Sequence, residues 1–133
     1  MPRSRSEALT EREAQVMDVL WRLGPATAEQ VREALPGRPH DSTVRTLLRV
    51  LEGTGHVARD DRGTAYTFRA TVDRARAQRT AVRSLLNRFF GGSAEDLVLR
   101  LVEDEAITPE QLEEIRQSLQ TQQGNRRTRG DPR

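Results

Sequence analysis

Hydrophobic residues recur at helical spacing in two runs within the first part of the chain. The first run follows a capping box, Thr-Glu-Arg-Glu at residues 10–13, and stops at Gly24. The second follows another capping box, Thr-Ala-Glu-Gln at residues 27–30, and stops at Pro36. In a capping box two side chains satisfy the free amides of the first helical turn. The sequence therefore predicts two helices with well-defined starts.

A third amphipathic run follows, and we expect a helix that is capped by Asp41 or Ser42 and continues to about Gly53. Its apolar residues share one stripe: Val44, Leu47, Leu48 and Leu51. At 100° per residue the opposite face carries Ser42, Arg45, Thr46 and Arg49, with Thr43 and Val50 on its flanks. The pattern predicts that the apolar stripe is buried and that the polar face meets solvent.

The periodicity changes after Gly55 from helical to alternating. Residues 56–59 and 64–69 are typical of two strands around a turn at residues 60–63, with Tyr66 and Phe68 on one face. Three short helices followed by a hairpin is the order of elements in a winged helix-turn-helix domain. We therefore predict such a domain, mostly α with a small β-hairpin wing, over residues 7–70.

Three more amphipathic segments follow, beginning near Val72, Ser93 and Thr108. Their apolar positions include Val82, Leu86, Phe89, Leu97, Leu101, Leu112, Ile115 and Leu119. Because one hairpin cannot cover this much apolar surface, residues 71–122 are predicted to form a three-helix dimerisation region that a second copy covers. Residues 123–133 are predicted to be a disordered basic tail.

Composition mainly excludes functions. The formal net charge is only +2, and the absence of cysteine excludes disulfides and thiolate sites and fits a reducing, cytoplasmic location. No apolar run is long enough to span a membrane, and we expect no signal peptide. His40 and His56 are the only imidazoles, and neither has a second ligand at metal spacing. With no catalytic constellation in the sequence, we expect no enzyme, metal or cofactor.

The exposed face of the third helix carries residue types that read DNA. Arginine pairs bidentately with guanine, threonine contacts the thymine methyl, and free amides at a helix start can hold a phosphate. In the wing, arginines could reach phosphate or the minor groove, although Asp60 and Asp61 repel phosphate and a plain polar turn fits equally well. The predicted DNA-binding residues are Ser42, Thr43, Arg45, Thr46, Arg49, Arg59 and Arg62.

Four motifs resemble the penicillinase-repressor family (BlaI/MecI/CopY type). They are Leu-Thr-Glu-Arg-Glu-Ala-Gln-Val-Met-Asp-Val-Leu-Trp at 9–21, Ser-Thr-Val-Arg-Thr-Leu-Leu at 42–48, Gly55, and Leu-Val-Leu-Arg-Leu-Val-Glu at 97–103. The resemblance covers roughly residues 7–122. It implies a homodimeric, sequence-specific transcriptional repressor on a palindromic DNA operator. In the β-lactam branch it also implies release by proteolysis, with an upstream receptor protease as partner.

The chain departs from this family pattern in three places. Basic residues that the family usually carries near Val50 and at residues 52–54 are absent, the family's Asn-Phe cleavage bond falls on Arg100-Leu101, and the cysteines of the copper-sensing branch are missing. Winged helices also serve as docking domains. The alternative function is therefore a protein–protein interaction module without specific DNA binding.

Overall fold

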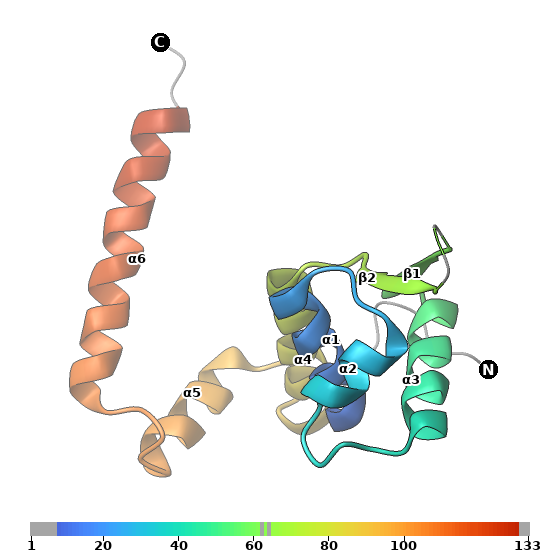
Figure 1. Cartoon of the computed structure of the whole chain (residues 1–133). Coiled ribbons are helices and arrows are strands. Elements are labelled where there is room, and N and C mark those ends of the chain that lie inside the picture. The colour runs from blue at the N-terminus through green and yellow to red at the C-terminus, as the bar shows by residue number, and fades with distance from the viewer. Residues whose placement is uncertain (1–7, 62, 64, 131–133) are drawn as a thin grey trace. The chain divides into compact units, whose positions relative to one another are not determined.

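The computed structural model describes residues 8–61, 63 and 65–130 (Figure 1). The elements are α1 (Glu11–Leu23), α2 (Ala28–Ala34), α3 (Asp41–Gly53), β1 (Val57–Asp60), β2 (Thr67–Ala70), α4 (Arg74–Phe89), α5 (Ala94–Glu103) and α6 (Pro109–Gly130). The contacts divide the chain into two compact units, Met1–Leu85 and Leu86–Arg133. The mostly helical fold with one antiparallel hairpin confirms the predicted winged helix-turn-helix class.

Local hydrogen bonds explain where α1 and α2 begin. The Glu13 amide donates to Thr10 Oγ1 at 3.2 Å and the Thr10 amide donates to Glu13 Oε1 at 2.8 Å. Thr27 and Gln30 exchange the corresponding pair of bonds at 3.1 and 2.8 Å. Both predicted capping boxes are therefore confirmed, and each satisfies two amides that the helix itself leaves unpaired.

The start of α3 differs from the prediction, because the capping residue is His40 rather than Asp41 or Ser42. His40 has an extended backbone, and its Nδ1 accepts a hydrogen bond from the Ser42 amide at 3.2 Å. With the ring in the capping position, Asp41 becomes the first helical residue and its carboxylate pairs with Arg45 one turn later. The predicted end at Gly53 is confirmed.

The core of the first unit lies between α1, α2, α3 and the hairpin. The buried residues of α3 are Val44, Leu48 and Leu51, and Leu47 is half-buried against them. They pack with side chains of the other elements: Val16, Met17, Val19, Leu20, Ala26, Val31, Leu35 and Val57. The apolar stripe predicted for α3 is thus buried, so the opposite face of the helix points away from the core.

The wing is an antiparallel hairpin in which Val57 pairs with Ala70 and Asp60 with Thr67. Both strands end one residue later than the predicted segments, and they begin one and three residues later, at Val57 and Thr67. Ala26 and Phe68 exchange backbone hydrogen bonds of 3.0 and 2.8 Å, so the turn between α1 and α2 also pairs with β2. This pairing fixes the wing against the helices, at the C-terminal end of α3 (Figure 1).

Helix α4 begins two residues later than predicted, after Asp73, which accepts a hydrogen bond from the Arg76 amide at 2.7 Å. Just before α4, the Val72 carbonyl accepts a hydrogen bond from Trp21 of α1. We expected the two parts of the chain to divide between residues 70 and 71. Because contacts to α1 hold the start of α4, the first compact unit instead continues to Leu85.

The second unit contains the end of α4 together with α5 and α6. Neither α4 nor α5 has a buried residue, and the large exposed apolar side chains of the second unit include Phe89, Leu99, Leu101, Leu112, Ile115 and Leu119. On the part of α4 that belongs to the first unit, Val82 and Leu85 are exposed as well. The tail expected to be disordered is helical up to Gly130, which corrects the prediction for residues 123–130; residues 131–133 lie outside the described part. Extending an existing helix adds one hydrogen bond per residue, and no proline interrupts α6 before Pro132.

The buried stripe of α3 yields a stability prediction. Leu48 is 1 % exposed in the core, whereas Val50 on the same helix is 38 % exposed. Leu48→Ala should lower the free energy of unfolding of the first unit by about 2–5 kcal/mol, because it removes buried methyl groups and leaves a cavity. Val50→Ala should change it by about 0.5 kcal/mol or less. Urea denaturation followed by the fluorescence of Trp21 measures both, and equal losses would contradict this orientation of α3.

Candidate nucleic-acid interface

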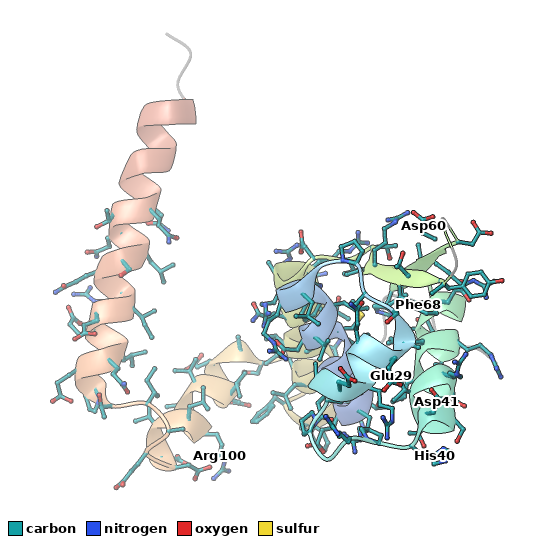
Figure 2. The ribbon with its side chains drawn as sticks, viewed as in Figure 1. Glu29, His40, Asp41, Asp60, Phe68 and Arg100 are labelled. Carbon is teal, nitrogen blue, oxygen red and sulfur yellow. The ribbon has the colours of Figure 1, made fainter. Side chains whose placement is uncertain are left out.

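The exposed face of α3 carries five of the seven predicted DNA-binding residues. Ser42, Thr43, Arg45, Thr46 and Arg49 are all exposed there. Figure 2 shows His40 and Asp41 at the start of this helix and Asp60 on the wing beyond its other end. The face therefore runs from the helix cap to the hairpin without a covering element in the first unit.

Short-range contacts hold the first two turns of this face. Arg45 Nε lies 2.8 Å from Asp41 Oδ2, and the Thr46 hydroxyl donates to the Ser42 carbonyl at 2.9 Å. Among the described residues Arg49 makes no hydrogen bond or ion pair, so its guanidinium keeps all of its donors for another molecule. Of the two predicted base-reading arginines, one is tethered to its own helix and the other extends into solvent.

A groove of about 760 Å³ lies between α3, the start of α2 and the wing. Its described charged side chains are Arg45, Arg49 and Glu52 of α3, Glu29 of α2, and Arg59 and Asp61 of the wing. Three arginines thus face three carboxylates, and their formal charges cancel. The groove is mixed in charge rather than a continuous basic surface.

Arg59 lies in β1 and is held inside this groove. Its Nε is 3.5 Å from Glu52 Oε2, and its guanidinium carbon is 4.6 Å from the centroid of the Tyr66 ring. These contacts hold Arg59 against Glu52 of α3 and against the Tyr66 ring. Arg62, the other predicted wing arginine, lies outside the described residues.

Sequence reasoning missed Glu52 and Glu29 as part of this site. Glu52 follows Arg45 by seven residues, which is about two helical turns, so the helical period already placed the two side chains on one face. Glu29 gave no such signal, because it reaches the groove only through the packing of α2 against α3. The Tyr66 ring likewise meets Arg59 only once the hairpin has formed.

The described part of the chain meets neither the requirements of a metal site nor those of a membrane-spanning helix. No group of three or more His, Asp or Glu side chains there could hold a metal ion, and none of its helices is long and apolar enough to cross a bilayer. His40 caps α3, and His56 is buried with its Nδ1 2.7 Å from the Thr54 hydroxyl oxygen. Both imidazoles therefore have local structural partners.

Comparison with known proteins gives a consistent result. A family model described as "Penicillinase repressor" matches residues 9–121, which is most of the chain. The penicillinase repressor of Bacillus licheniformis is 25% identical over 114 residues, covering 84% of this chain and 89% of that protein. The methicillin resistance regulatory protein MecI of Staphylococcus aureus (strain N315) is 24% identical over 118 residues, covering 87% and 96%. The similarity thus includes the winged-helix unit and most of the helices that follow it.

Proposed function

The chain belongs to the penicillinase-repressor family, and we propose that it is a cytoplasmic transcriptional repressor that binds a palindromic DNA operator as a homodimer. The observation that carries the DNA-binding part is the orientation of α3. One stripe of this helix is buried through Val44, Leu48 and Leu51, and this leaves Arg45 and Arg49 exposed one turn apart. A helix with two arginines on its free face fits the width of the major groove and the donor pattern that guanine requires.

In the proposed complex, α2 and α3 act as a helix-turn-helix pair with α3 in the major groove. Arg49 pairs with a guanine through donors that no described residue occupies. Arg45 must give up its ion pair with Asp41 before it can bind a base or a phosphate. The loss of that pair reduces the net contribution of Arg45 to the binding free energy. The Thr46 hydroxyl already donates to the helix backbone, so its methyl group is the part offered to a thymine. The Ser42 amide donates to His40 Nδ1 at 3.2 Å and the Thr43 amide donates to the His40 carbonyl at 3.0 Å, so a phosphate at the helix start must first displace the imidazole.

The wing contributes a phosphate contact rather than base recognition. Arg59 is half-exposed and already paired with Glu52, so a DNA phosphate must displace that carboxylate. Among the described residues of the groove, acids and arginines are equal in number, which keeps sequence-independent attraction to DNA low. Operator affinity would then depend mainly on base contacts from α3.

Homodimer formation is supported by the apolar surface of the second half of the chain. Phe89 is 68 % exposed, and Ile115 and Leu119 are about half-exposed in α6, whose residues 109–124 are all exposed. An apolar surface of this extent is stable in water only when another surface covers it. The residues proposed for the interface are Val82, Leu86, Phe89, Leu97, Leu101, Leu112, Ile115 and Leu119, all of them on α4, α5 and α6.

A protein-interaction module is the second candidate, and the balanced charge of the groove is what favours it. The two functions differ in their response to salt. DNA binding releases condensed counterions, so the affinity falls linearly on logarithmic axes as salt rises. Binding to a protein partner has no such obligatory slope.

The first functional prediction concerns Arg49. Arg49→Ala should weaken binding to the operator by about 1–3 kcal/mol and relax the preference at one base pair in each half-site. Binding to a scrambled duplex should change little, because the lost contact is to a base. Gel-shift titrations measure both, with an operator selected from random duplexes and Arg22→Ala on α1 as the matched loss of one charge. Equal losses on both duplexes would instead make Arg49 a backbone contact.

The second functional prediction concerns the dimer. Ile115→Glu should produce a folded monomer, because a carboxylate on the shared apolar stripe of α6 would have to be buried without a partner. Gln117→Glu adds the same charge to the opposite face of the same helix and should leave the dimer intact. Sedimentation velocity distinguishes the two states. A dimeric Ile115→Glu protein with normal helix content would place the interface elsewhere.

The third functional prediction concerns release by proteolysis. The bond that corresponds to the family's cleavage site, Arg100-Leu101, lies inside α5 and lacks the Asn-Phe pair. A helical peptide bond must unwind before a protease can cut it, so a receptor protease of the β-lactam type should leave this chain intact. Mass spectrometry after incubation with such a protease checks this, and a clean fragment of residues 1–100 would overturn it.

A further inference from the structure

Three contacts converge on the short segment that joins the wing to α4. Trp21 Nε1 donates a hydrogen bond to the Val72 carbonyl at 2.8 Å, and Arg74 Nη1 lies 2.9 Å from Asp18 Oδ1. The Arg74 guanidinium also lies over the Trp21 ring, with 5.1 Å between its central carbon and the ring centroid. The Val72 side chain itself is buried. The first turn of α4 is therefore fixed to α1 at more than one point.

Asp18 holds two arginines, and only one of them connects two helices. Arg22 Nε lies 3.0 Å from the second oxygen of Asp18, but Arg22 is on α1 itself. The hydrogen bond from Arg74, more than that from Arg22, holds the pKa of Asp18 below its usual value. The carboxylate is consequently charged at neutral pH, and Arg74 is its one arginine partner from α4.

Helix α4 passes from the first compact unit into the second. It spans Arg74–Phe89 with no proline or glycine, while the units divide between Leu85 and Leu86. Its 16 residues correspond to a rod of roughly 24 Å. A swing of about 10° at its first turn would move the far end by about 4 Å, which exceeds the rise of one base pair along DNA, about 3.4 Å.

We propose that Arg74 is a positioning residue that determines which half-site spacing the dimer accepts. The inference rests on the proposed function, because it requires two winged-helix units joined through the helices that begin with α4. A two-fold dimer reads two half-sites at a separation set by the geometry between its recognition helices. By tying the start of α4 to Asp18 and Trp21, Arg74 restricts the angle between the winged-helix unit and α4, and with it that separation.

The first test compares Arg74→Gln with Arg22→Gln. Each variant removes one positive charge and one partner of Asp18, but only Arg74→Gln removes a contact that joins α4 to α1. Operators are selected from random duplexes with each full-length protein and sequenced. The wild type and Arg22→Gln should enrich one half-site spacing, whereas Arg74→Gln should enrich the same half-site at several spacings. The affinity penalty for one inserted base pair should be lower in Arg74→Gln by about tenfold. A single, unchanged spacing in Arg74→Gln would overturn the proposal.

A second measurement needs neither DNA nor the dimer. The chain has no cysteine, so spin labels can be attached to the double variant Glu33→Cys and Arg83→Cys, with one label on α2 and one on α4. Diluted with unlabelled chain, this protein gives the distance distribution between the two helices by pulsed electron paramagnetic resonance. Arg74→Gln should broaden the distribution and Arg22→Gln should not.

The two measurements separate the inference from the function on which it rests. If the wild type enriches no half-site at all, the proposed operator binding fails, and the distance distribution still decides whether Arg74 holds α4. If Arg74→Gln leaves that distribution narrow, the positioning role is wrong even for a protein that binds DNA.

Discussion

The burial of one stripe of α3 is the constraint from which the rest of the first unit follows. Val44, Leu48 and Leu51 are almost completely removed from solvent and contact α1, α2 and the wing. Rotating the helix to bury its other face would place arginine guanidinium groups in an apolar core, at a cost of several kcal/mol per unpaired charge. Arg45 and Arg49 are therefore exposed because of what the opposite face buries, and any partner of α3 meets them first.

The orientation of α3 also brings acidic side chains next to the arginines of the groove. Glu52 lies on the exposed face and engages Arg59, so the acid that ties the wing to α3 also neutralises one of the groove's arginines. An exposed ion pair of this kind contributes little to stability, about 0–1 kcal/mol. Its larger effect is on selectivity, because phosphates of any sequence meet carboxylates as well as guanidinium groups. A groove with this composition favours ligands that form directed hydrogen bonds over ligands that supply only negative charge.

The sequence predicted those features that depend on neighbouring residues. Capping boxes involve residues three apart, and an amphipathic stripe needs only the helical period, so α1, α2 and the buried side of α3 were predicted correctly. The capping role of His40 was missed because histidine is not among the preferred caps, and its ring serves here only through its orientation. The ion pair between Arg59 and Glu52 depends on how the hairpin folds back on α3. No periodicity within one element carries that information.

The boundary between the two units could not be predicted from the pattern of each segment alone, because it depends on contacts between distant residues. From its sequence pattern, α4 belongs with the amphipathic helices that follow it. In the structure it also has no buried residue of its own. Its attachment to the first unit depends on Trp21 and Asp18, which lie more than fifty residues earlier in the sequence. These contacts are individually weak, but they act at the end of a continuous helix. Their effect on geometry therefore grows with distance along α4, whereas their effect on stability does not. A few contacts can in this way restrict the direction of a helix without a large buried interface.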